Sequence, residues 1–156
     1  MSDAVLGEIT IDEADDDDRE WCAQLMASSE PWLTLGRTID QTRPLFHRTD
    51  SELYVARRDG MACGFLLLRD RGIIYSPYIA SLAVSPDSRG LGIGGRLLDF
   101  VEKRARESSK HIFLCVSSFN TRAQVLYDRH GYAVVGELKD YIVDGFSEYL
   151  MSKRLR

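Results

Sequence analysis

The sequence contains few cysteines, and this limits the kinds of site that it can build. Its three cysteines, Cys22, Cys63 and Cys115, are odd in number, lie far apart and each stand in an apolar stretch. A disulfide framework needs paired cysteines, and a zinc site needs clustered cysteine or histidine ligands. We therefore expect reduced cysteines in the core of a cytoplasmic protein, and no metal site.

Long hydrophobic runs are also absent. A run such as residues 64–68 stops at a charge, whereas a membrane-spanning helix needs about 20 apolar residues. The opening Met1-Ser2-Asp3 soon leads into acidic sequence, the reverse of the basic and then apolar order of a secretory signal. We expect a mature chain that starts here, a cytoplasmic location and no membrane partner.

The third absence is an excess of basic residues. Twenty Lys and Arg face 24 Asp and Glu, which gives a net charge of −4, so the chain lacks the positive field on which non-specific nucleic-acid binding depends. No repeat or low-complexity linker divides the 156 residues, of which 44% are hydrophobic. We expect one domain over residues 1–156, with a hydrophobic core and no nucleic-acid partner.

What the sequence does contain is a series of strand and helix patterns. Their spacing predicts strands at 8–11, 52–57, 61–69, 73–84, 112–116, 132–138 and 146–153, and helices around 21–26, 38–46, 93–105 and 121–130. Asp59-Gly60 predicts a hairpin turn, and Pro77 requires a break, a bulge or an edge in its strand. The order predicts an α+β fold with a mixed, largely antiparallel sheet of six to seven strands and about four helices.

An acidic run at residues 12–18 precedes the first helix. Carboxylates are favourable at the positive end of a helix, and acidic first turns are common. We interpret the run as a helix cap and dipole partner in preference to a metal site.

A glycine-rich segment at residues 82–95, LAVSPDSRGLGIGG, lies between a predicted strand and an amphipathic helix. Glycine lacks Cβ, so the backbone can approach an anionic ligand closely, and the N–H groups at the start of a helix point along its dipole toward such a ligand. The alternative is a glycine-rich turn without a ligand. We predict a phosphate-binding loop.

Gly90, Gly92 and Gly95 also match the G-x-G-x-x-G spacing of dinucleotide-binding folds. In such folds an Asp or Glu follows about 20 residues later and binds the ribose. Residues 114–118, LCVSS, contain no acid, so the dinucleotide interpretation is disfavoured.

Two motifs together resemble the GNAT N-acetyltransferase family. Arg89-x-x-Gly92-x-Gly94, preceded by Leu-Ala-Val-x-Pro, is similar to its acetyl-coenzyme A (acetyl-CoA) signature. A second signature, Asn120-x-x-Ala123-x-x-Leu126-Tyr127 followed by Gly131-Tyr132, is similar to the coenzyme-contacting helix and the strand after it. The resemblance covers residues 73–155, and the first half of the chain matches only in the order of its elements.

The resemblance implies a three-layer fold in which two central strands diverge and hold the pantetheine arm of acetyl-CoA. Backbone groups of Leu82 and Val84 would bond to the pantetheine amides, and N–H groups of the glycine loop would hold the pyrophosphate. The cofactor-binding residues implied are Leu82, Ala83, Val84, Arg89, Gly90, Gly92, Ile93, Gly94, Gly95, Asn120, Ala123 and Tyr127.

The resemblance also makes Tyr127 the candidate catalytic acid that protonates the departing thiolate, although Tyr127 could instead only pack in the core. Asn120 could bind pantetheine, cap its helix or do both. Related enzymes carry a glutamate where Cys115 stands here, so the general base is left open between water, Glu30, Tyr78 and Glu148. A mid-strand thiol between apolar neighbours has a raised pKa, which disfavours Cys115 as a nucleophile.

The acceptor pocket is expected to form between the first two helices and the last hairpin. Glu30, Trp32, Tyr78 and Tyr141 are its candidate substrate-binding residues, with simple core packing as the alternative for each. The chain is thus expected to acetylate a primary amine, either a small molecule or a protein N-terminus, and to release coenzyme A. A non-catalytic acetyl-CoA sensor and a transferase of longer acyl groups remain alternatives, and a homodimer is possible.

Overall fold

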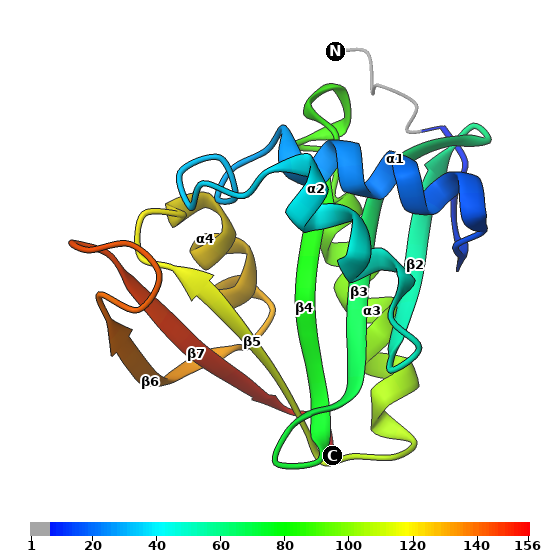
Figure 1. Ribbon diagram of the computed structural model, residues 1–156. Coiled ribbons are helices and arrows are strands. Elements are labelled where there is room, and N and C mark those ends of the chain that lie inside the picture. Colours follow the sequence, from blue (N-terminus) through cyan, green and yellow to red (C-terminus); the bar gives the residue numbers. More distant parts are fainter. Residues whose placement is uncertain (1–6) are drawn as a thin grey trace, which may run out of the picture.

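The computed structural model describes residues 7–156 (Figure 1), so the expectation about Met1-Ser2-Asp3 lies outside the described residues. No helix in this range is long and apolar enough to cross a membrane. The elements follow in the order β1 (Ile9–Glu13), α1 (Asp16–Ala27), α2 (Ile39–Thr42), the 3₁₀ helix η1 (Arg43–His47), β2 (Ser51–Arg58), β3 (Met61–Ile73), β4 (Ser76–Val84), η2 (Pro86–Ser88), α3 (Ile93–Arg106), β5 (His111–Ser117), α4 (Thr121–Arg129), β6 (Ala133–Lys139) and β7 (Ser147–Arg154).

The strands form one seven-stranded sheet in the order β1-β2-β3-β4-β5-β7-β6. Every neighbouring pair is antiparallel except β4 and β5, which are parallel. The parallel pair needs a crossover, and α3 supplies it. The predicted mixed, largely antiparallel sheet with about four helices is confirmed.

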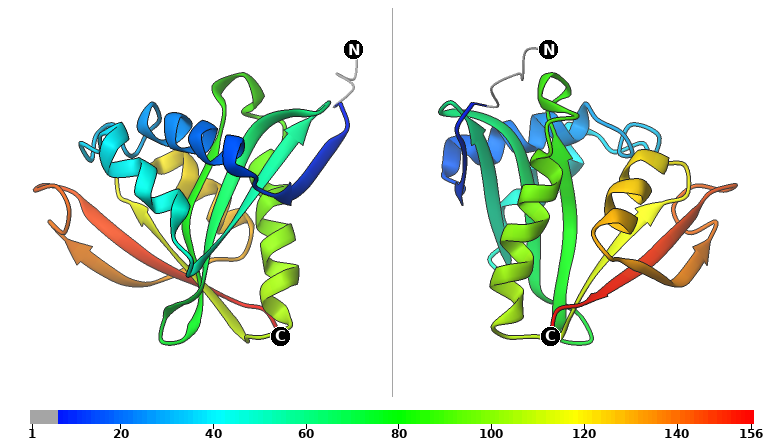
Figure 2. Two further views of the ribbon diagram at one scale, coloured as in Figure 1. Left: turned by 45° about the vertical axis from the view of Figure 1, so that its right-hand side comes forward. Right: turned by 180° about the vertical axis from the view of Figure 1, so that it is seen from behind.

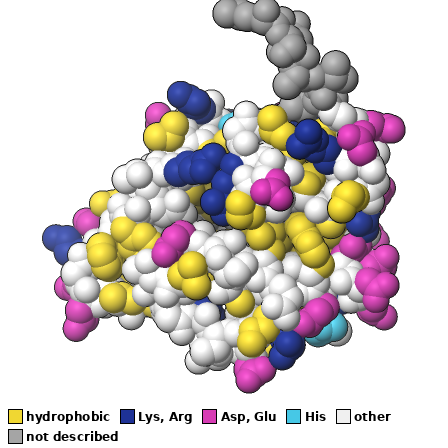
Figure 3. Space-filling model, turned by 90° about the horizontal axis from the view of Figure 1, so that it is seen from above, with side chains coloured by type: hydrophobic (Ala, Val, Ile, Leu, Met, Phe, Trp, Pro, Cys, Tyr) yellow, Lys and Arg dark blue, Asp and Glu magenta, His cyan; other side chains and the backbone are white. Residues whose placement is uncertain are grey.

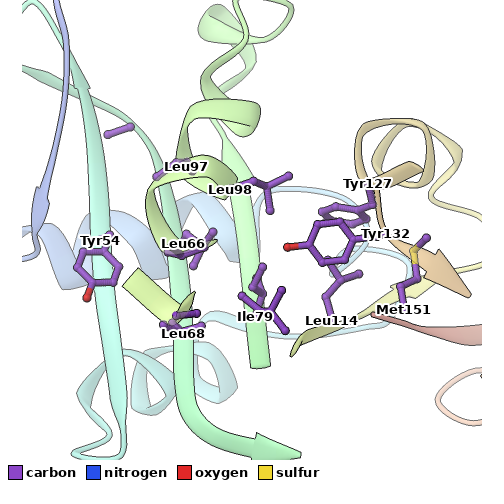
Figure 4. Close-up of a cluster of buried hydrophobic side chains, with 14 of the residues drawn as sticks. Tyr54, Leu66, Leu68, Ile79, Leu97, Leu98, Leu114, Tyr127, Tyr132 and Met151 are labelled. Atoms are coloured by element: carbon purple, nitrogen blue, oxygen red, sulfur yellow. The ribbon is translucent and has the colours of Figure 1, made fainter. Parts of the chain in front are cut away.

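Helices cover both faces of the sheet (Figure 2). Because side chains alternate along a strand, β3 sends Leu66 and Leu68 into one buried cluster and Phe65 and Leu67 into another. The first cluster includes Leu97 and Leu98 of α3 (Figure 4); the second includes residues of α1 and η1. Two apolar cores thus hold the sheet in a three-layer arrangement.

The hairpin between β3 and β4 lies where the sequence predicted continuous strand. β3 extends to Ile73 and β4 begins at Ser76, so the predicted strand boundary at residue 73 is wrong. Ile74 and Tyr75 form the turn with φ of 48° and 59°. A left-handed turn made by a β-branched and an aromatic residue lacks the glycine or asparagine that normally marks it in a sequence.

Pro77 lies opposite a break in the ladder, as its missing N–H requires. The β3–β4 register moves from Arg69↔Tyr78 directly to Ile73↔Ser76. The predicted helix at 38–46 is also divided, since α2 ends at Thr42 and Pro44 lies in the 3₁₀ helix η1. Each proline interrupts a regular element.

The acidic run caps α1. Asp15 and Asp18 form a capping box in which each side chain accepts from the other's backbone N–H. Asp18 is also buried against Arg57, 2.6 Å away. Burial is the largest single effect and opposes ionisation of Asp18, but the hydrogen bonds from Arg57 and Asp15 and the charge of Arg57 together outweigh it and lower the pKa. The run stabilises the start of the helix, as the sequence predicted.

Candidate active site

The central strands β4 and β5 diverge after a short paired stretch. Only Tyr78↔Phe113 and Ile79↔Leu114 are in register, although β4 continues to Val84 and β5 to Ser117. Figure 1 shows the two ribbons separating toward the top of the molecule. Beyond Ile79, the edge of β4 opposite to β3 therefore has no strand partner, and the backbone groups along this edge are available to a ligand.

A bulge in β4 turns its side chains at this point. The β3–β4 register steps from Leu68↔Ile79 to Leu67↔Ser81, so Ala80 has no partner. As a result Ile79 and Leu82 pack toward the cluster on the α3 side, while Ala80 and Ala83 pack toward the α1 side. The bulge thereby places Leu82 where β4 and β5 diverge, in the lining of the space between them.

The space between the diverging strands is a cavity of about 430 Å³. It extends from the first residues of α4 to the loop between α1 and α2 and to the loop between β6 and β7. Its lining consists of Pro31, Trp32, Leu35, Arg37, Arg69, Tyr78, Ile79, Ala80, Ser81, Leu82, Cys115, Val116, Ser117, Asn120, Ala123, Tyr127, Leu138, Tyr141, Ile142 and Glu148.

The glycine loop lies at the start of α3. Gly90 and Gly92 have φ of 78° and 79°, a conformation that glycine adopts without strain. The N–H of Arg96 is bonded to the carbonyl of Gly92 at 3.1 Å, and the three preceding helical residues have backbone donors that α-helical geometry leaves without partners inside the helix. The loop thus presents N–H groups of residues 93–95 at the positive end of α3.

The other two glycines of the loop allow α4 to approach closely. A Cβ at Gly94 would lie 3.1 Å from Leu126 Cδ2, and one at Gly95 would lie 2.9 Å from His130 Cε1. Larger residues would push α4 away from α3. The loop therefore combines two turn glycines with two contact glycines.

The proposed cofactor residues fall into two groups. Leu82, Asn120, Ala123 and Tyr127 line the cavity. The other proposed cofactor residues do not line the cavity. The side chains of Ala83 and Ile93 are buried in the two cores, so only their backbone groups can face a ligand. The Arg89 side chain is exposed, and its Nε donates to the Val84 carbonyl at 3.2 Å.

Tyr127 is buried in the cavity wall, 6% exposed, and its ring meets that of Tyr132 edge to face at 5.9 Å. Burial raises the pKa of Tyr127 to about 12. The phenol is therefore protonated at neutral pH, as a hydrogen-bond donor to a departing group must be.

Asn120 caps α4. Its Oδ1 accepts a hydrogen bond from the N–H of Ala123 at 3.3 Å, which leaves its side-chain N–H₂ group to donate elsewhere. Since Asn120 also lines the cavity, one side chain can fix the helix and still contact a ligand.

Aromatic and apolar residues form the other end of the cavity. Trp32 is 9% exposed and Tyr141 is 67% exposed, and together with Tyr78 they line this end. Glu30 is not part of the lining: it is exposed, and its Oε2 accepts from the backbone N–H of Thr34 at 3.2 Å. The structure brings three of the four candidate substrate residues together and places Glu30 outside.

Glu148 is the carboxylate in the cavity wall. It lies opposite Ser117 in the β5–β7 ladder, and Ser117 Oγ donates to its Oε1 at 2.6 Å. Both residues are buried. Glu148 was one of several open candidates for the base in the sequence, because nothing local shows that residue 148 pairs with residue 117.

Tyr78 of β4 and Cys115 of β5 both line the cavity between the diverging strands. Burial raises the pKa of the Tyr78 phenol and of the Cys115 thiol. Cys115 is therefore a protonated thiol at neutral pH, which agrees with the sequence argument against it as a nucleophile.

Several lining residues carry no recognisable signal in the sequence. Arg37 follows Gly36 in the α1–α2 loop, Arg69 lies near the end of β3, and Leu138 and Ile142 flank the β6–β7 loop. Their meeting depends on tertiary structure alone.

Comparison with known proteins identifies the family. Residues 12–132 match the family model described as acetyltransferase (GNAT) family. An N-alpha-acetyltransferase of Sulfurisphaera tokodaii is 29% identical over 118 residues, which cover 68% of this chain and 71% of that protein. A 5-NmdU N-acetyltransferase of Pseudomonas phage PaMx11 is 28% identical over 85 residues, and the match spans 54% of this chain but only 59% of the phage protein.

Solved structures share the fold. An aminoglycoside 6′-N-acetyltransferase, determined in complex with coenzyme A, superposes with a TM-score of 0.77 over 94% of this chain and 97% of that chain, at 17% identity. The diverging strands, the glycine loop and the family match lead to one assignment. The chain belongs to the GNAT acetyltransferase family.

Proposed function

We propose that the protein is an N-acetyltransferase that moves an acetyl group from acetyl-CoA to a primary amine by direct attack in a ternary complex. One observation carries the proposal: a single cavity joins the free edge of β4 and the start of α4 to the loops after α1 and β6. We name the part near Asn120 and Tyr127 the donor end, and the part near Trp32 and Tyr141 the acceptor end. Both substrates can meet between them.

The residues at the donor end fit acetyl-CoA. The unpaired edge of β4 at Leu82 and Val84 offers backbone groups to the pantetheine amides, and Ala123 leaves room beside them. The N–H groups of the glycine loop and the dipole of α3 favour the pyrophosphate.

Acetyl-CoA supplies an acyl group activated as a thioester. A bond forms between the amine nitrogen and the carbonyl carbon, the carbon–sulfur bond breaks, the amine loses a proton and the sulfur gains one. Glu148 is the carboxylate that lines the cavity and accepts the amine proton. Ser117 holds Glu148 in place through its 2.6 Å hydrogen bond.

Tyr127 acts on the sulfur side. Its phenol is protonated at neutral pH because burial raises the pKa to about 12. It donates a hydrogen bond to the sulfur as negative charge develops there and transfers its proton, which it regains from water. Direct attack is favoured because the raised pKa of Cys115 keeps that thiol from acting as an acetyl carrier.

Free-thiol release from acetyl-CoA, measured across a panel of amines, tests this function. Tyr127→Phe is expected to lower kcat by about 100-fold, the lower range for general acid catalysis, with an unchanged Kd for acetyl-CoA. Tyr75→Phe removes a phenol that is 85% exposed and lies outside the cavity, so it serves as the matched control. Binding of acetyl-CoA without thiol release from any amine would indicate a sensor, and a higher rate with propionyl-CoA would indicate a different acyl donor.

A further inference from the structure

The charged side chains that line the cavity are unequal in sign. Arg37 and Arg69 line the acceptor side, and Glu148 is the one acid in the lining. Seen from above, Lys and Arg side chains gather near the middle of the upper face beside hydrophobic patches (Figure 3). A pocket built for a polyamine or another multiply cationic acceptor would have the opposite balance.

Arg69 is held where its guanidinium has no ion partner. Its Nε is buried, and no group within residues 7–156 accepts a hydrogen bond from it. The residue pairs with Tyr78 in the β3–β4 ladder, which keeps its stem beside the cavity. A buried donor without an acceptor costs free energy, so an anionic ligand at this point would be favoured.

The carboxylate of Asp50 lies near Arg69 but does not accept a hydrogen bond from its Nε. Asp50 lies close enough for the charge of Arg69 to contribute to lowering its pKa, but the larger effect comes from hydrogen bonding with Arg48. Arg48 contacts both carboxylate oxygens of Asp50, at 2.8 and 2.6 Å. Asp50 is therefore already engaged.

Arg37 adds a second cation on the other wall. Its backbone N–H donates to the carbonyl of Trp32 at 3.0 Å, so the loop that carries it is tied to the aromatic wall of the cavity. The Arg37 side chain is exposed and forms no ion pair in the described part of the chain. It is free to contact a ligand that enters past Trp32.

We propose that the acceptor is a small primary amine that also carries an anionic oxygen group, a carboxylate or a phosphate. This inference rests on the proposed function. Arg69 and Arg37 bind the oxyanion, for which guanidinium geometry is well suited, while the amine reaches Glu148 deeper in the cavity. Trp32, Tyr78 and Tyr141 enclose the carbon skeleton between the two charged groups.

Matched pairs of amines test the proposal in the full chain. Free amino acids are compared with the corresponding amino acid amides, and phosphoethanolamine with ethanolamine, by thiol release at saturating acetyl-CoA. The anionic member of at least one pair is expected to have a kcat/KM at least about 10-fold higher, as for a charge-assisted hydrogen bond. The pair that shows the preference identifies carboxylate or phosphate.

Variants then assign the preference to the arginines. Arg69→Gln is expected to raise KM for the anionic amine by about 10- to 100-fold, with little change for its neutral partner or for acetyl-CoA, and Arg69→Lys is expected to recover part of the loss. Arg71→Gln, on the same strand but outside this cavity, is the control. A preference for neutral or polycationic amines, or an equal loss for both members of each pair, would overturn the inference while the proposed function stands; absence of thiol release with every amine would overturn both.

Discussion

The donor end of the cleft is built mainly from backbone, and the acceptor end mainly from side chains. At the donor end, the free edge of β4 and the glycine loop before α3 present main-chain groups. At the acceptor end, Arg37, Arg69 and Tyr141 come from three separate parts of the chain. Backbone groups suit a ligand that is always the same, whereas side chains on loops can be exchanged without disturbing the sheet.

The strongest expected effect concerns the carboxylate that lies between the two ends. Glu148→Gln keeps the shape of the side chain but removes the proton acceptor, so kcat at neutral pH is expected to fall by about 100-fold or more, as for loss of a general base. Steady-state thiol release measures the loss, and calorimetry should show unchanged acetyl-CoA binding.

Glu137→Gln is the matched control for Glu148. Glu137 also accepts a hydrogen bond from a serine, Ser147 Oγ at 2.8 Å, but on the exposed side of the β6–β7 hairpin. If the two variants lose activity equally, or if raising the pH fails to restore part of the Glu148→Gln rate, Glu148 is not the base.

A smaller effect on ligand binding is expected when a glycine with positive φ is replaced by alanine at the donor end or at the acceptor end of the cavity. Gly92 and Gly36 have φ of 79° and 73°, and an added Cβ meets nothing within 4 Å at either position. Alanine is disfavoured by about 1–2 kcal/mol in this conformation, so Gly92→Ala is expected to weaken acetyl-CoA binding by about 10-fold as the loop amides shift.

Gly36→Ala imposes the same strain beside Arg37 and is expected to raise KM for the amine without changing the Kd for acetyl-CoA. Titration calorimetry and initial rates separate the two constants. The comparison between the ends fails if either variant changes both constants by the same factor.

The smallest effect is expected at Cys115, which lines the middle of the cavity. Because burial raises the pKa of its thiol, Cys115→Ala is expected to change the rate of thiol release by less than about twofold. Mass spectrometry after incubation with acetyl-CoA should find no acetylated enzyme. A stable acetyl group on Cys115 would contradict direct transfer.

The donor side could be predicted from the sequence because its parts are local. The strand, the turn glycines and the helix start all lie within residues 82–95, and their order alone predicts which backbone N–H groups lie at the start of α3. The second signature is equally compact, since Asn120 caps α4 and Tyr127 lies seven positions later, in the same helix. The spacing of the strand and helix patterns likewise predicted a mixed, largely antiparallel sheet, but not that β4 and β5 form its parallel pair.

The acceptor side could be predicted only in part: Trp32, Tyr78 and Tyr141 were candidates from the sequence and line the cavity, whereas its charged residues meet only through tertiary structure. Glu30 and Arg37 lie in the same loop, yet Glu30 turns outward to bond the Thr34 N–H while Arg37 reaches the cavity. The pairing of Arg69 with Tyr78 depends on the hairpin turn at Ile74 and Tyr75, and neither of these residue types predicts a turn. The position of Glu148 beside Ser117 follows from the β5–β7 register, which the sequence does not define.

The short β4–β5 junction divides the proposed tasks between two parts of the chain. In the proposed mechanism Glu148 and Tyr127 transfer protons and Ser117 orients Glu148, and all three belong to the segment from β5 onward. Arg37 and Arg69, which are proposed to bind the acceptor, precede β4. Two pairs of residues in register join the two parts at the sheet's centre. The two arginines proposed to bind the acceptor's oxyanion can therefore be exchanged through changes before residue 76, without altering the residues proposed to transfer protons.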